Sequence, residues 1–247
     1  MGWVTSFRPQ ARLERQVERF TVIGAADGES HVVLPTTAVV LGFQFLGRVQ
    51  AEQQLLSPAG VTGLQEGPRT YSYRGSTGSV LVHFTTQGAA TLGVPVDELT
   101  NASVSLDALL PRARVAEALE RLQEAADDEA RVGVVENVLL ELPFARDRAV
   151  SLAIERLIRP DGPALVAAVA RELGLSERQL ERRFRARVGL TPKRFASLAR
   201  FERAVSLANG TSTLAQVAAA AGYFDQSHLS RDFRRFGGGA PSRLRTG

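Results

Sequence analysis

Hydrophobic positions in the first part of the chain occur as short runs, without helical spacing. Between residues 20 and 90, runs rich in Val, Phe, Tyr and Thr are separated by Gly, Pro, Asp and Ser. The runs read FTVIG, HVVLP, AVVLGFQFLG, RTYSYRG and SVLVHFTT. Short runs of this kind bounded by turn residues predict strands, and several at this spacing are typical of a sandwich or small barrel. We therefore expect a β-barrel over about residues 1–100.

The hydrophobic period changes after this β-rich part. Over residues 104–143, Leu and Val recur at three and four residues, which predicts amphipathic helices. The polar segment ADDEAR at 126–131 interrupts the pattern as a turn, and Pro143 ends it. The sequence thus predicts a helical hairpin that packs on the barrel and completes a first domain, residues 1–145.

From residue 146 onward one pattern occurs twice: an alanine-rich helix, a Gly turn, and a polar helix with arginines. The copies are LVAAVARELGLSERQLERRF at 165–184 and LAQVAAAAGYFDQSHLSRDF at 214–233. In each copy Ser176 or Asp225 can cap the second helix, which carries a Leu and a Phe four residues apart. This predicts two helix-turn-helix motifs, and a long helix from Pro192 that ends at Asn209 and Gly210 joins them. The expected fold class is α+β, with an all-helical domain at 146–247.

Charge is divided between the two expected domains. Residues 1–145 contain 11 Arg and Lys against 17 Asp and Glu, a net −6, whereas residues 146–247 contain 19 against 9, a net +10. A basic domain joined to an acidic one is the electrostatic footprint of a polyanion-binding module. The absence of cysteine excludes disulfides, thiolate zinc sites and cysteine nucleophiles. Because the chain has no long apolar run and no signal-like N-terminus, we expect a cytoplasmic protein without membrane contact.

The second helix of each motif has an outward face suited to the major groove of DNA. Arginine donates a bidentate pair of hydrogen bonds to guanine, glutamate accepts from cytosine, and Ser or Gln reads either kind of edge. Arg182 and Arg231 occupy equivalent positions and are the principal base readers that we expect. The full set of expected DNA-binding residues is Arg178, Gln179, Glu181, Arg182, Arg185, Gln226, Ser227, His228, Ser230 and Arg231. Basic residues outside this outward face are expected to contact phosphate: Arg183, Lys193, Arg194 and Arg235.

The spacing of the two motifs predicts how they meet a duplex. A joining helix of some 17 residues is about 25 Å long, which with its turns can set the two motifs one DNA turn apart. One chain would then read two successive major-groove segments of double-stranded DNA.

At these residues the chain resembles the AraC/XylS family of bacterial transcription regulators. SERQLERRFRARVGLTPKRF is similar to the family's first motif, RFERAVSLA to its joining helix, and GYFDQSHLSRDFRRFGGGAP to its second motif. The resemblance places base contacts at Arg178, Glu181, Arg182 and, in the second helix, at Gln226, Ser227, Ser230 and Arg231. It also implies contact with RNA polymerase, activation of transcription, and a cupin-like N-terminal domain.

The N-terminal domain admits three interpretations: it senses a small-molecule effector, it mediates homodimerisation or binds a protein partner, or it is a cupin-type enzyme. A metal-dependent cupin needs two or three converging histidines, and this half contains only His31 and His83. Nucleophile, phosphate-binding and dinucleotide motifs are absent, so we expect neither catalysis nor a cofactor or metal. Expected effector-pocket residues, from inward positions of the strands, are Phe43, Phe45, Tyr71, Tyr73, His83 and Phe84.

Overall fold

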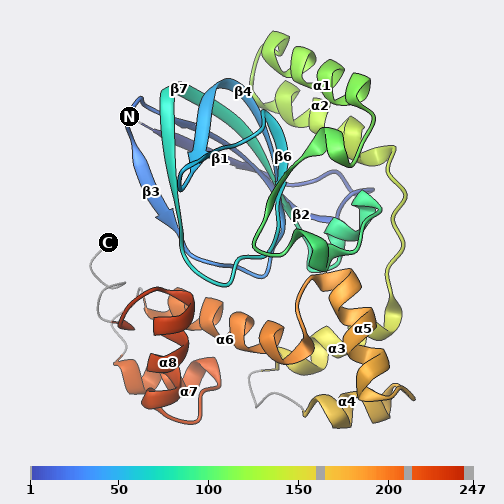
Figure 1. Cartoon of the computed structure of the whole chain (residues 1–247), viewed down its shortest axis with the longest axis vertical. Coiled ribbons are helices and arrows are strands. Elements are labelled where there is room, and N and C mark those ends of the chain that lie inside the picture. Colours follow the sequence, from blue (N-terminus) through green and yellow to red (C-terminus); the bar gives the residue numbers. More distant parts are fainter. Residues whose placement is uncertain (1, 160–164, 209–212, 242–247) are drawn as a thin grey trace.

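The computed structural model describes residues 2–159, 165–208 and 213–241 and divides them into a sheet half and a helical half (Figure 1). The first half is one antiparallel eight-stranded sheet in the order β1-β2-β7-β4-β6-β8, with β3 on β7 and β5 on β4. The strands are β1 Trp3–Phe7, β2 Val17–Ala25, β3 Ser30–Val33, β4 Val40–Ala51, β5 Gln54–Leu55, β6 Ala59–Thr62, β7 Arg69–Phe84 and β8 Ser103–Ser105. Strands β1 and β8 end the path and do not pair with each other among the described residues, so the expected barrel is not closed by hydrogen bonds.

Strand β7 organises the sheet. It pairs with β4 along most of its length, with β3 near its start and with β2 near its end. The sequence predicts two strands here, because Gly75 and Gly78 resemble a turn. In the structure the chain continues as one strand, and the ring of Phe45 occupies the place where a side chain on Gly78 would lie.

The two faces of the sheet are used differently. Phe20, Leu41, Phe43, Val82 and Phe84 are fully buried on one face. This face is covered by a hairpin of α1 (Arg112–Glu124) and α2 (Asp128–Leu140), which contact β4, β2 and β7 (Figure 1). The opposite face lines a cavity. Because successive side chains along a strand point to opposite faces, neighbouring residues alternate between the helix-covered face and the cavity face.

The hairpin confirms the helical prediction from Arg112 onward, with a shorter turn than expected, whereas residues 104–108 of the expected helical segment form the end of β8 and a 3₁₀ helix. Asp127 caps α2 by accepting a hydrogen bond from the Ala130 N–H at 2.8 Å, so the helix begins inside the polar segment. Three short 3₁₀ helices connect the sheet to the hairpin: η1 Gly88–Leu92, η2 Val96–Leu99 and η3 Leu106–Ala108.

The second half is helical throughout its described residues. Its helices are α3 Arg148–Leu157, α4 Val166–Glu172, α5 Glu177–Val188, α6 Pro192–Ala208, α7 Leu214–Ala221 and α8 Gln226–Phe236. Helix α3 packs on α4, α5 and α6, and α6 joins α5 to the α7–α8 pair. The α+β fold class is confirmed. The expected end of the joining helix, at Asn209 and Gly210, lies outside the described residues. In the described part of the chain no helix is both long and apolar enough to cross a bilayer.

The two halves contact each other through α5 and the 3₁₀ segments. Helix α5 packs on η1 and η2. Thr100 Oγ1 donates a hydrogen bond to the carbonyl oxygen of Gly189 at 2.8 Å. Gly189 has a φ of 96°, which favours glycine, and an added Cβ there would lie 3.1 Å from Thr100 Oγ1. The end of the first motif is therefore fixed against the sheet half.

Candidate nucleic-acid interface

Helix α5 is held by one face and exposes the other. Ser176 caps it in a reciprocal capping box with Gln179: the Ser176 Oγ accepts from the Gln179 N–H, and the Gln179 Oε1 accepts from the Ser176 N–H. Leu180 and Phe184 are fully buried, as predicted. The expected base readers on the other side are all exposed: Arg178, Gln179, Glu181, Arg182 and Arg185. Gln179 thus caps the start of α5, in addition to the contact with DNA that the sequence predicts for it.

Helix α8 repeats this arrangement. The Asp225 carboxylate accepts from the His228 N–H at 2.6 Å and caps the helix, and Leu229 and Phe233 are fully buried, as predicted. Gln226, Ser227 and Arg231 are exposed, whereas His228 and Ser230 are half-buried. The two helices therefore present unlike residues in equivalent places: Arg and Glu on α5, and Gln, Ser and Arg on α8.

A buried polar cluster lies under α8. The His228 and Tyr223 rings meet edge to face at 5.1 Å, and the Arg200 guanidinium lies 5.5 Å from the Tyr223 ring. Asp232 is only 8% exposed, and this burial raises the pKa of its carboxyl group. The cluster fixes α8 on α6 and α7, and it commits the His228 ring to packing.

Three of the four expected phosphate contacts are engaged in ion pairs. Arg183 Nε lies 3.0 Å from Asp147 Oδ2, Arg194 Nη1 lies 2.8 Å from Glu66 Oε2, and Arg235 Nη2 lies 3.3 Å from Glu66 Oε1. Lys193 is exposed and forms no ion pair within the described residues. Because Glu66 belongs to the sheet half, one carboxylate of that half occupies two of these arginines.

One residue beside the expected readers was missed by the sequence reasoning, whereas the helical spacing of α8 already sends Arg234 outward with Arg231. Phe224, in the turn before α8, is 94% exposed, an unusual position for a large apolar side chain. Arg234 is exposed one helical turn beyond Ser230 and lies on the same side of α8 as Arg231. A lone aromatic residue in a polar turn was the signal for Phe224, but it belongs to no periodic pattern.

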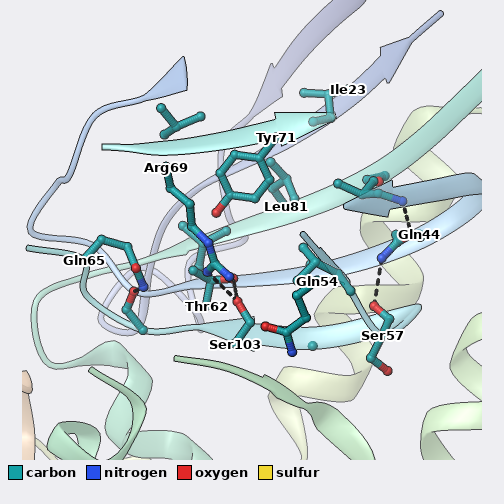
Figure 2. Close-up of a pocket in the computed structure, with 18 of the residues that line it drawn as sticks. Ile23, Gln44, Gln54, Ser57, Thr62, Gln65, Arg69, Tyr71, Leu81 and Ser103 are labelled. Atoms are coloured by element: carbon teal, nitrogen blue, oxygen red, sulfur yellow. Dashed lines mark hydrogen bonds between the residues drawn. The ribbon is translucent and has the colours of Figure 1, made fainter. Parts of the chain in front are cut away.

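The sheet half contains a cavity of about 720 Å³ between the curled strands and the loops at one end of the sheet (Figure 2). Of the pocket residues expected from the sequence, Tyr71, Tyr73 and His83 line it. Phe43, Phe45 and Phe84 do not. Phe43 and Phe84 lie on the opposite face of the sheet in the core, and Phe45 packs against Gly78 and the Arg131 guanidinium, 4.3 Å from its ring.

Burial shifts the pKa values of two side chains that line the cavity, His83 and Tyr73. Burial, followed by the nearby Arg19, lowers the pKa of His83 to about 4. Because Arg19 only donates, His83 Nδ1 accepts across the 3.4 Å that separate them, and the ring is neutral. Burial raises the pKa of Tyr73 to about 12, and its hydroxyl pairs with His31 Nε2 at 2.7 Å. No group of three or more possible metal ligands occurs among the described residues.

Two loops that bound the cavity also touch the helical half. In the first, Thr36 and Ala38 line the cavity, and Thr37 between them donates to Glu202 of α6 through its N–H at 3.1 Å and its hydroxyl at 2.8 Å. In the second, Gln65 lines the cavity, and the adjacent Glu66 forms the two ion pairs described above. The cavity and the helical half are therefore connected through neighbouring residues.

Two family models match the chain. Residues 169–247 match a helix-turn-helix domain, and residues 5–105 match a domain of unknown function (DUF6597). No curated protein matches the chain significantly.

Several solved structures are similar to the chain. A transcriptional regulator with an AraC-type DNA-binding domain from Chromobacterium violaceum is 26% identical over 39% of this chain and 88% of its own, with a TM-score of 0.35. ToxT from Vibrio cholerae is 12% identical over 92% of this chain and 98% of its own, with a TM-score of 0.48. The DNA-binding domain of AdpA, solved with a target DNA, is 25% identical over 40% of this chain and 91% of its own, with a TM-score of 0.37.

Proposed function

We propose, from the AraC-type helix-turn-helix domain that forms its C-terminal part, that this chain regulates transcription in response to a small-molecule effector. DNA binding and transcription regulation follow from that domain, which belongs to a family of regulators and not of enzymes. The finer proposal is that residues 146–247 read two successive major-groove segments through α5 and α8, while residues 1–145 bind the effector.

The observation that carries the DNA-reading proposal is the pair of capped helices with exposed arginines. Both helices bury a Leu and a Phe completely, so their opposite faces are fixed toward solvent. Arg182 and Arg231 occupy equivalent exposed positions on these faces, and a guanidinium group donates two hydrogen bonds to guanine in the major groove. We propose these two as the principal base readers, with Arg178, Glu181, Arg185, Gln226, Ser227 and Ser230 beside them.

Effector sensing is supported by the path from the cavity to α6. Thr37 and Glu66 each stand next to residues that line the cavity, and each contacts the helical half. A ligand that moves either loop would change how α6 and α8 are held. Activation through RNA polymerase rests on the AraC/XylS resemblance alone. Homodimerisation is a further part of the proposal, although one chain with two reading helices does not require it to span a bipartite site.

Selection from genomic DNA tests the proposal. Purified full-length chain is incubated with genomic fragments, and the bound fragments are sequenced, for the native chain and for a variant with both Arg182→Ala and Arg231→Ala. We expect the native chain to enrich a motif of two segments about 10 base pairs apart. The double variant should lose that motif and keep weak, sequence-independent binding. Enrichment of the same motif by both proteins would contradict the assigned readers.

A further inference from the structure

The cavity in the sheet half is electrostatically one-sided. Arg48 and Arg69 are among its lining residues, whereas no Asp or Glu lines it in the described part of the chain. Arg48 is exposed, and Arg69 is half-buried and reaches from the start of β7 across the cavity toward Ser103 (Figure 2). A cationic group in a partly apolar space without a carboxylate partner favours an anionic ligand.

The Arg69 guanidinium is held at one edge and open at the other. Its Nη1 donates to Ser103 Oγ at 2.7 Å, and Ser103 Oγ lies 3.0 Å from Thr62 Oγ1. Because the serine hydroxyl has one proton and accepts from Arg69, it can donate that proton to Thr62. Within the described residues the Arg69 side chain makes no other hydrogen bond and no ion pair. Two hydroxyl groups thus orient the guanidinium while its remaining N–H groups stay available.

The rest of the cavity suits an apolar body. Ile23, Val40 and Leu81 line it from the strands, and Tyr71 lies beside Arg69 with its ring 5.8 Å from the guanidinium carbon (Figure 2). A cavity of about 720 Å³ is in the range that encloses a small organic molecule. Buried apolar surface and one oriented cation describe an amphipathic ligand with its charge at one end.

We propose that the cavity binds an organic monocarboxylate with an apolar body, whose carboxylate accepts hydrogen bonds from the open edge of the Arg69 guanidinium. A planar guanidinium matches a carboxylate in two parallel hydrogen bonds, and one fixed arginine balances one negative charge. A phosphate dianion would need further buried donors, and the other lining arginine, Arg48, is exposed. The inference deepens the proposed function, because this ligand would be the effector of the N-terminal half.

Titration calorimetry of the full chain with matched acids and amides tests the ligand class. The probes are a panel of aliphatic and aromatic monocarboxylates, each paired with its primary amide, which keeps the shape and removes the charge. We expect acids to bind and their amides to bind about 10- to 100-fold more weakly, as loss of charge-assisted hydrogen bonds predicts. An amide that binds as tightly as its acid, or a panel in which no acid binds, overturns the proposal.

Substitution of the arginine tests the site. Arg69→Gln should bring the affinity for each acid down to that of its amide, and Arg69→Lys should restore part of the difference because it keeps the charge but not the fork. The matched control is Arg74→Gln, which removes an exposed arginine from the same strand outside the cavity and should leave the affinity unchanged. Unchanged affinity in Arg69→Gln overturns the site. If Arg69→Gln fails to fold, the acid–amide comparison on the native chain still decides the ligand class.

DNA binding measured on the same samples separates this site from the proposed function. The probe is a genomic fragment enriched by the native chain, and its affinity is measured with and without each ligand. Acids that bind through Arg69 and leave DNA affinity unchanged would support the carboxylate site and contradict effector control. A response of DNA affinity to the amides but not to the acids would support effector control and overturn the carboxylate class.

Discussion

Individual arginines are expected to divide between base reading and phosphate contact. Arg182→Ala or Arg231→Ala removes an exposed guanidinium group. We expect the free energy of DNA binding to become less favourable by about 1 to 3 kcal/mol through one base position, with relaxed specificity at that position. The measurement is DNA affinity by fluorescence anisotropy on the selected site and on single-base variants of it. Equal weakening on random DNA would show that the arginine contacts only phosphate.

Lys193 provides the matched contrast for these arginines. It is exposed, without an ion pair among the described residues, at the start of α6. Lys193→Ala should weaken binding to all sequences alike and reduce the salt dependence of log affinity by about one unit of slope. Unchanged salt dependence would contradict its proposed contact with phosphate.

His83 gives the sheet half a pH-dependent stability. Its folded pKa of about 4 lies below the ordinary 6.5, so the unfolded chain takes up the proton first as the pH falls. The stability from neutral His83 is complete above the ordinary pKa and is lost as the pH falls toward 4. In this window we expect the free energy of unfolding to fall by up to about 1 kcal/mol per pH unit from His83. His83→Gln should reduce this slope in denaturant titrations at about pH 7 and pH 5. An equal pH dependence in both proteins would contradict the shift.

The residues buried by the two motifs could be predicted from sequence, whereas the cavity residues could only partly be predicted. Leu180 and Phe233 follow from helical period, because only one side of each helix can pack. The strand prediction placed Phe43 and Phe84 together with Tyr73 and His83. Alternation separates Phe84 from His83 in β7, but which face meets the helices and which meets the cavity depends on how the sheet curls. That curl is set by contacts between distant strands.

At the scale of elements, the capping box of α5 can be tested directly. Ser176→Ala removes the acceptor for the Gln179 N–H and should destabilise the chain by about 1 kcal/mol. Gln179→Ala removes the reciprocal bond and should cost somewhat less. The measurement is unfolding in denaturant, with Ser206→Ala on an exposed position of α6 as the control that leaves stability nearly unchanged. If Gln179→Ala leaves stability unchanged but alters base preference, its amide reads DNA and does not cap.

Elements with a strong local period were predicted closely, and those fixed by long-range pairing were not. The joining helix was expected from Pro192 and begins there. Strand β7 was expected as two strands because its glycines resemble turn residues, but β4 pairs with both parts and keeps them in one ladder. Strands β1, β6 and β8 are too short to show a clear alternation of hydrophobic and polar residues, so their positions depend on pairing with neighbouring strands.

At the scale of the whole molecule, the contact between the halves was not visible in the sequence. It is made by polar side chains in loops, such as Thr37 and Glu66, whose positions belong to no hydrophobic period. The charge division between the halves gave a partial indication, since an acidic domain and a basic domain attract each other. The charge division could not indicate that the single carboxylate of Glu66 would pair with Arg194 and Arg235, which lie outside the base-reading faces of α5 and α8.

Glu66 is therefore expected to restrain DNA binding. Its carboxylate lies 2.8 Å from Arg194 and 3.3 Å from Arg235, and an acid beside two arginines competes with phosphate for them. Glu66→Gln removes that charge and frees both side chains. We expect DNA affinity to rise about 2- to 10-fold at low salt and its salt dependence to steepen, because more phosphate contacts release more counterions. The measurement is anisotropy on the selected site over a range of salt concentrations.

The control for Glu66→Gln must remove the same charge from the same half without touching the arginines. Glu117→Gln does so, because Glu117 is exposed on α1 in the hairpin on the far side of the sheet. A general reduction of the acidic field would raise DNA affinity equally in both variants. A rise confined to Glu66→Gln would locate the restraint in the contact between the cavity loop and the helical half, so that a ligand displacing this loop would relieve the same restraint. Equal affinities in the two variants would contradict it.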